Sequence, residues 1–174
     1  MQNVYYIDSN FIKENSPQYI LSIRYATDGL SFCVHDPYNK LLAFYFQPFN
    51  LKSQDTVIAK VKKIMVDDVL LNLKYKKVYF LSCNKEKMLL PAHAFNKNTL
   101  ADMYRICLQP HKNDTLLYRK IKMIEAYLTE ALPRSFVTFL ATRHPSLCIV
   151  NSAYPFIIQS LSNILFNACL LYTS

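Results

Sequence analysis

Residues 19–48 read YILSIRYATDGLSFCVHDPYNKLLAFYFQP. The stretch alternates apolar, β-branched and aromatic segments with turn residues, which are Asp28-Gly29 after the first segment and Asp36-Pro37 after the second. Segments of this kind predict strands, and an Asp-Gly pair between two of them is a strong hairpin signal. The three segments (residues 19–25, 30–35 and 41–48) therefore predict a three-stranded antiparallel meander.

The residues after the meander predict a crossover helix and further strands. Ser53 suits the N-cap position, and apolar residues at helical spacing extend the pattern to about residue 73. Residues 77–82 (KVYFLS) predict a buried strand, and residues 86–91 a short one. A shorter helix is expected over residues 99–107.

The rest of the chain repeats the same pattern of strands, helix and strand. The expected elements are paired strands at 116–123 and 126–132, a helix from Pro133 to His144, a strand at 146–152, and a helix from Pro155 to Phe166. This repetition predicts an α/β fold of duplicated mixed-sheet units with backing helices, the second unit being incomplete. We divide the chain into a lead-in (1–18), a first unit (19–110) and a second, truncated unit (111–168).

The composition excludes several phosphate-binding motifs. The chain has 174 residues, of which 52% are hydrophobic, and Gly29 is its single glycine. Average usage of about 7% would give about 12 glycines. Walker loops, dinucleotide GxGxxG motifs and kinase glycine flaps need several glycines, because the backbone must approach phosphate without a Cβ in the way.

The charge and cysteine content indicate a soluble protein in a reducing compartment. The net charge is +8, from 20 Lys and Arg against 12 Asp and Glu, and the lysines are spread over several segments as on a solvated surface. Five scattered cysteines form no CxxC pair, and the first 16 residues lack the pattern of a secretory signal. We therefore expect a cytoplasmic protein with reduced thiols. Apolar stretches are too short to span a membrane.

The last six residues, Cys169 to Ser174, match what the mosaic end of a transposon used in sequencing libraries encodes in one reading frame. We therefore interpret residues 169–174 as a sequencing-adapter artefact and the chain as truncated at its C-terminus. These residues are left out of the fold prediction.

Three segments carry a resemblance to a known family. They are ILSIRYATDGLSFCVHDP (20–37), KMLLPAHAFNKNTLADMYRI (87–106) and AYLTEALPRSFVTFLATRHPSL (126–147). In this order they resemble the DUF3822 family, an uncharacterised family known mainly from Bacteroidetes. Its members are similar in fold to actin-like ATPases, so the resemblance implies an actin-like, ribonuclease-H-like fold. No activity is assigned to the family, so it implies no catalytic residues.

Active actin-like ATPases hold phosphates with two Asp-x-Gly hairpins, whose glycines let backbone N–H groups reach phosphate oxygens. The first hairpin of this chain carries Thr27-Asp28-Gly29, which hairpin chemistry alone explains. The second hairpin, around residues 122–125, reads KMIE and has neither Asp nor Gly. The sequence thus favours a degenerate, non-hydrolysing domain, a pseudo-ATPase.

Other candidate sites are no better supported. Ser135, Ser146 and Ser152 lack the glycines of a nucleophile elbow. His93 and His144 each suit a helix-end cap or a general base. Asp67 and Asp68 are adjacent on the expected helix and would point about 100° apart. Cys33 and His35 share a strand face without further metal ligands. We therefore assign no catalytic, cofactor-binding or metal-binding residues, and no cofactor.

The leading hypothesis is a cytoplasmic, non-catalytic binding or scaffold protein that acts on protein partners. One alternative is a divergent nucleotide-binding phosphotransferase or ATPase. A second alternative is a basic nucleic-acid-binding protein, in which Tyr75, Tyr79 and the neighbouring lysines would form a stacking surface.

Overall fold

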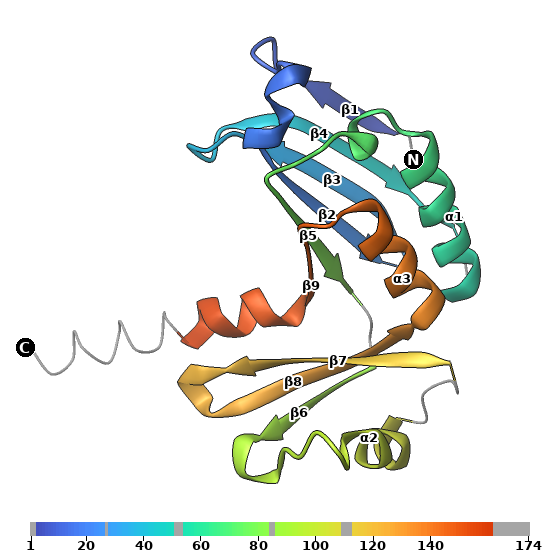
Figure 1. The fold of residues 1–174 in the computed structure, drawn as a ribbon, viewed down its shortest axis with the longest axis vertical. Helices are drawn as coiled ribbons and strands as arrows, with labels where there is room; N and C mark the ends of the chain where they lie inside the picture. The colour runs from blue at the N-terminus through green and yellow to red at the C-terminus, as the bar shows by residue number, and fades with distance from the viewer. Residues whose placement is uncertain (1–2, 27, 51–53, 84–85, 109–112, 162–174) are drawn as a thin grey trace, which may run out of the picture. The chain divides into compact units, whose positions relative to one another are not determined.

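The computed structural model describes residues 3–26, 28–50, 54–83, 86–108 and 113–161 (Figure 1). The chain divides into two compact units. Unit 1 consists of Met1–Cys83 and Ser135–Val150, and unit 2 consists of Asn84–Arg134 and Asn151–Ser174. Unit 2 thus interrupts the sequence of unit 1, whereas the sequence pattern places the division near residue 110.

Unit 1 contains a six-stranded mixed sheet in the order β1-β4-β3-β2-β5-β9. Its strands are β1 (Val4–Ile7), β2 (Ile20–Ala26), β3 (Gly29–His35), β4 (Leu41–Pro48), β5 (Lys77–Ser82) and β9 (Leu147–Asn151). The predicted meander is confirmed, since β3 pairs antiparallel with both β2 and β4. The chain then crosses over, and β5 pairs parallel with β2.

Two helices, α1 (Gln54–Asp67) and α3 (Arg134–Arg143), lie side by side over one face of this sheet (Figure 1). The strands present alternating buried residues to them, as in the pattern Leu21, Ile23 and Tyr25 on β2. The rings of Tyr25, Phe80 and Phe136 form the centre of the core, with centroids 5.6–5.7 Å apart. Phe136 on α3 and Phe80 on β5 are completely buried.

The end of α1 is capped by side chains from other parts of unit 1. The amide nitrogen of Asn72, in the 3₁₀ turn η2 (Leu70–Asn72), donates to the carbonyl oxygens of Val66 and Asp68 at 2.9 and 2.7 Å. The Arg143 guanidinium donates to the Met65 carbonyl at 2.9 Å. These bonds satisfy carbonyl groups that a helix C-terminus otherwise leaves unpaired.

Unit 2 is built on an antiparallel sheet in the order β6-β8-β7. Its elements are β6 (Lys87–Pro91), the 3₁₀ turn η3 (Ala92–Ala94), α2 (Leu100–Leu108), β7 (Asp114–Ile121), η4 (Lys122–Ile124) and β8 (Ala126–Pro133). Residues 153–161 are also helical. The central strand β8 is almost entirely buried, and its Glu130 accepts a 2.9 Å hydrogen bond from Asn151.

The sequence pattern misses two features of this arrangement. Residues 1–18, expected to be a lead-in, contain β1 and the 3₁₀ turn η1 (Lys13–Gln18). The helix and strand expected to belong to the second unit, α3 and β9, join unit 1 instead. Periodicity identifies elements but not their partners, because a strand's neighbours are set by long-range pairing.

Some expectations lie outside the described residues. These are the Ser53 cap, the end of the last helix at Phe166, and the interpretation of residues 169–174. None of the helices within the described ranges is both long and apolar enough to cross a membrane.

Gly29 is required by a close approach between strands. A Cβ on this residue would lie 2.5 Å from the Gln47 carbonyl oxygen of β4 and 3.2 Å from the Pro48 Cα. Both atoms belong to backbone, so the clash cannot be relieved by turning a side chain. The backbone φ of +159° is also one that residues with a side chain rarely adopt.

We predict that Gly29→Ala lowers the free energy of unfolding by more than about 1 kcal/mol, because the β3–β4 pairing must open to admit the methyl group. Urea unfolding followed by circular dichroism measures the change. Ser31→Ala on the same strand is the matched control and should stay within about 0.5 kcal/mol of the parent. Equal unfolding midpoints for the two variants would contradict the prediction.

Candidate functional site

The most conspicuous surface of unit 1 is the edge strand β1. Its four residues, VYYI, are all exposed, with 44–55% of each accessible to solvent. They pair with β4 on one side only, and β1 stands at the end of the strand order. An exposed apolar edge strand is a template for pairing with another chain, which proteins usually shield with charges, proline or a covering segment.

The hydrogen-bonding groups of β1 can be assigned to its two sides. The Asp8 N–H donates to the Leu42 carbonyl of β4 at 2.8 Å. Because N–H groups along a strand alternate in direction, those of Val4 and Tyr6 also point toward β4. The N–H groups of Tyr5 and Ile7 then point outward from the sheet. An incoming strand would therefore find free donors on alternate residues.

Asp8 fixes the end of this strand. Its carboxylate accepts hydrogen bonds from the backbone and side-chain nitrogens of Asn10 at 2.8 and 2.6 Å, and from the Tyr6 hydroxyl at 3.1 Å. Lys40 Nζ lies 3.3 Å from the same group. The bonds from Asn10, first the backbone one, hold the pKa of Asp8 well below its usual range. The charged turn thus anchors β1 in place.

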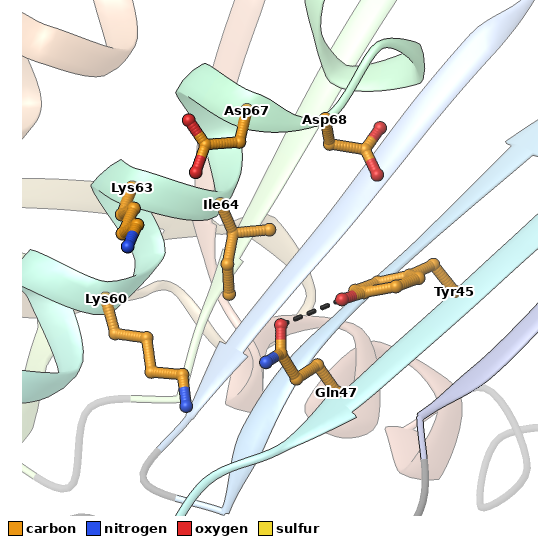
Figure 2. A pocket seen from close by; sticks show the side chains of 7 residues that line it. All are labelled: Tyr45, Gln47, Lys60, Lys63, Ile64, Asp67 and Asp68. Atoms are coloured by element: carbon orange, nitrogen blue, oxygen red, sulfur yellow. Dashed lines mark hydrogen bonds between the residues drawn. The ribbon is translucent and has the colours of Figure 1, made fainter.

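A pocket of about 400 Å³ lies between α1 and β4 (Figure 2). The helix contributes Lys60, Lys63, Ile64 and Asp67 to its lining, and Asp68, the residue after the helix, also lines it. Tyr45 and Gln47 form its floor on β4. The pocket adjoins the edge strand, because the Tyr45 ring packs edge-on against Tyr5 of β1 at 5.8 Å.

The groups lining this pocket suit binding rather than covalent chemistry. The Tyr45 hydroxyl donates to Gln47 Oε1 at 2.8 Å, which leaves the Gln47 amide nitrogen available as a donor (Figure 2). Burial, and then the charge of Asp68, raises the pKa of Tyr45, so the phenol stays protonated at neutral pH. The pocket offers two ammonium groups, two carboxylates and the Gln47 amide, without a nucleophile paired to a base.

Asp67 and Asp68, which are adjacent in the sequence, both line this pocket. Asp67 is the last residue of α1, and the N–H of Asp68 still donates to the Ile64 carbonyl at 2.9 Å, as in the last turn of a helix. Asp68 Oδ1 is already engaged by the backbone N–H groups of Leu70 and Leu71, at 2.8 and 3.2 Å. The two carboxylates point in different directions in Figure 2. Asp68 is thus largely a cap for η2.

The turn between β2 and β3 holds Asp28, which in the sequence can be compared with the aspartate of a phosphate-binding hairpin and which hairpin chemistry alone explains. Its two carboxylate oxygens face the Arg24 guanidinium at 3.3 and 3.2 Å, and its carbonyl accepts the Phe49 N–H at 2.9 Å. Asp28 therefore closes the turn, and an arginine already balances its charge. Thr27 lies outside the described residues.

The second hairpin, between β7 and β8, has a different chemistry. Glu125 adopts a left-handed backbone conformation (φ 44°) that takes the place of a glycine. Its carboxylate forms an ion pair with Lys120 at 2.7 Å, and its carbonyl accepts the Ala92 N–H. This turn is closed by side-chain and backbone bonds and presents no Asp-Gly pair.

The structure brings none of the suggested catalytic residues into an acid–base pair within the described ranges. His93 is exposed in η3, whereas His144 is 96% buried at the end of α3 in unit 1, because only 4% of it is accessible. Ser146 donates to the Tyr75 carbonyl at 3.3 Å. Ser135 is exposed on α3 and Ser152 follows β9.

The Cys, His and Tyr residues considered for metal and nucleic-acid binding lie buried or half-buried on the strands of unit 1 or beside them. Cys33 and His35 lie half-buried on one face of β3, and no group of three or more His, Cys, Asp or Glu residues in the described ranges could hold a metal ion. Tyr75 is buried, and its hydroxyl donates to the Leu70 carbonyl at 2.8 Å. Tyr79 is half-buried, with Lys77 Nζ 5.5 Å from its ring.

Sequence reasoning missed both the edge strand and the pocket beside it. The only signal for β1 is the run VYYI at residues 4–7, which is apolar but too short to alternate. The pocket depends on Tyr45 and Gln47 facing α1, which follows from the register of β4 rather than from any motif.

Comparison with known proteins agrees with the fold described above. A solved structure from Bacteroides thetaiotaomicron VPI-5482, described as a protein with actin-like ATPase fold and unknown function, superposes with a TM-score of 0.76 at 22% sequence identity. The match covers 86% of this chain and 58% of that chain, so this chain spans less than two thirds of its neighbour's length. No curated protein matches.

This likeness shows that the chain has an actin-like ATPase fold, as predicted. A family described as "Protein of unknown function (DUF3822)" matches residues 8–173, nearly the whole sequence. The chain therefore belongs to the DUF3822 family.

Proposed function

We propose that this protein is a cytoplasmic, non-catalytic member of the actin-like fold that binds another protein through β1. The observation that carries the proposal is the edge strand itself, with four exposed apolar residues and the outward N–H groups of Tyr5 and Ile7. Extended peptides bind sheet edges in this way, with backbone hydrogen bonds giving affinity and side-chain pockets giving specificity. The partner is an extended apolar segment of another polypeptide.

The pocket beside β1 supports the same proposal. An added strand would place side chains next to Tyr5, whose ring packs on the Tyr45 floor of the pocket. Lys60, Lys63 and Asp67 line the pocket with charges of both signs, so charged groups that flank the bound segment can fix its orientation. Apolar contact along the strand and a charged anchor beside it are complementary sources of affinity and orientation.

The two hairpin turns support a non-catalytic role. Phosphate loops need backbone N–H groups that stay open to the ligand and an acidic group that is free to act on Mg²⁺ or water. Asp28 is paired with Arg24, and Glu125 is paired with Lys120. A cytoplasmic location agrees with Cys33, Cys83 and Cys107, which are free thiols in the structure.

We predict a two-residue alternation in amide exchange along β1. The N–H groups of Tyr6 and Asp8 should be protected by β4, and those of Tyr5 and Ile7 should exchange rapidly in the isolated protein. Hydrogen exchange followed by NMR measures this. Strong protection at Tyr5 and Ile7 would show that the edge is already covered and would contradict the free edge.

The partner can be identified and the mode of binding tested in two steps. A photo-crosslinking residue at position 5, introduced into the protein in its native cells, should yield a defined crosslinked protein. The same residue at Ile106, which is 82% exposed in unit 2, is the control and should not yield it. Identical crosslinks at both positions would overturn the assignment of β1.

With that partner purified, we predict that Ile7→Pro weakens binding at least about tenfold, because it removes one outward N–H and leaves the β4 ladder intact. Calorimetry measures the affinity. Ile7→Val keeps the N–H and a β-branched side chain and should bind within about twofold of the parent. Unchanged binding by Ile7→Pro would exclude strand addition.

We also predict that the protein does not bind Mg-ATP at concentrations up to about 1 mM, because neither hairpin turn provides an open phosphate loop. Calorimetry on the whole chain measures this. Saturable binding that Asp28→Asn abolishes would overturn the non-catalytic role and establish the phosphotransferase alternative.

A further inference from the structure

Unit 1 holds a second pocket, of about 440 Å³. It lies toward the β5–β9 edge of the sheet, whereas β1 forms the opposite edge. It lies between the segment that joins η2 to β5 and the segment that joins α3 to β9. Its lining residues are Asn72, Leu73, Lys74, Tyr75, Val78, Thr142, Arg143, His144, Pro145 and Ser146. The volume falls within the range of small-molecule sites.

The charge of this pocket is one-sided. Lys74 and Arg143 are cations, and the lining contains no carboxylate. The salt bridges found among the described residues involve neither of these two side chains. A half-buried guanidinium without a carboxylate partner is costly, since desolvated charges are normally paired.

Arg143 is held in place by neutral groups only. Its guanidinium donates to the Met65 carbonyl and to Asn72 Oδ1, and it lies 5.4 Å from the centre of the Phe139 ring. The carbonyl groups at the end of α1 compensate part of the charge, because a helix C-terminus carries only about half a negative charge. The side chain is thus fixed in position while part of its charge is uncompensated.

Two residues that line the pocket each hold a buried nitrogen atom, Arg143 Nε and His144 Nε2, for which the described residues supply no hydrogen-bond partner. The two residues are adjacent, and His144 is 96% buried because only 4% of it is accessible. Burial, and then the charge of Arg143, lowers the pKa of His144, so its ring is neutral at pH 7. An unpaired buried polar atom costs about 1–3 kcal/mol. This cost makes the Arg143–His144 end of the pocket unfavourable without a further polar partner.

We propose that this pocket binds a small molecule through an anionic oxygen group, a phosphate or a carboxylate. Arg143 supplies the fixed charged donor, Lys74 an exposed charge, and His144 a neutral part of the wall. Guanidinium groups match the geometry of carboxylates and phosphates with paired donors. The site shares no lining residue with the edge strand or the pocket beside it, so either proposal can fail without the other.

The test uses inorganic phosphate and citrate, titrated into the whole chain at constant ionic strength. Histidine ring signals are followed by NMR. We expect a saturable shift of the His144 signals, and an upward shift of the pH at which His144 titrates, because the anion offsets the Arg143 charge. Preference for citrate would identify a carboxylate ligand, and preference for phosphate a phosphate ligand. No saturable shift with either anion would overturn the proposal.

Variants separate the site from general electrostatic attraction. Lys74→Gln should raise the dissociation constant about two- to fivefold, since an exposed charge contributes modestly. Lys13→Gln removes the same charge from the exposed turn η1 and should leave it unchanged. Arg143→Gln should raise it at least about tenfold. Because Arg143 also caps α1, the Lys74 and Lys13 comparison decides, and equal affinities for those two variants would overturn the site.

Discussion

The fold of unit 1 depends on the contact among the rings of Tyr25, Phe80 and Phe136. Tyr25 belongs to the meander, Phe80 to the parallel strand after the crossover, and Phe136 to a helix that follows about fifty residues of unit 2. Burying three aromatic rings contributes several kcal/mol, and truncating one of them costs about 3–5 kcal/mol. This burial compensates the entropy of closing the long loop that unit 2 forms, a cost that grows only slowly with loop length.

The elements of the fold could be predicted from the sequence where local signals are strong. Strand β4 has the expected bounds because Pro48 ends it and alternation marks it. The partners of the later elements could not be predicted, since α3 and β9 have the sequence pattern of the start of a repeat, yet α3 packs on the first sheet and β9 joins it. Strand β1 could not be predicted from the sequence, because it is stabilised by pairing with β4 rather than by a pattern within its own four residues.

The site was less predictable than the fold, for a physical reason. Asp28 and Gly29 have the residue types of a phosphate turn, but the strands around them decide what those residues do. Arg24, four residues away on β2, places its guanidinium over the carboxylate, and the carbonyl of Gln47 occupies the space beside the glycine. The same pair that would cradle a phosphate in one context closes a hairpin in this one. A motif of two residues therefore carries less information than the neighbours that pack on it.

Helix α1 is the element that the two proposed binding surfaces share. Its last two turns supply Lys63, Ile64 and Asp67 to the pocket beside β4. The Met65 carbonyl in the same turns accepts the Arg143 guanidinium of the other pocket. The two surfaces lie toward opposite ends of the strand order, and α1 contributes to both. An anion that draws Arg143 outward would weaken the cap on α1, whereas one that holds it in place would strengthen the cap. The cap is thus an element that both sites can bias, which is what energetic coupling between ligand and partner requires.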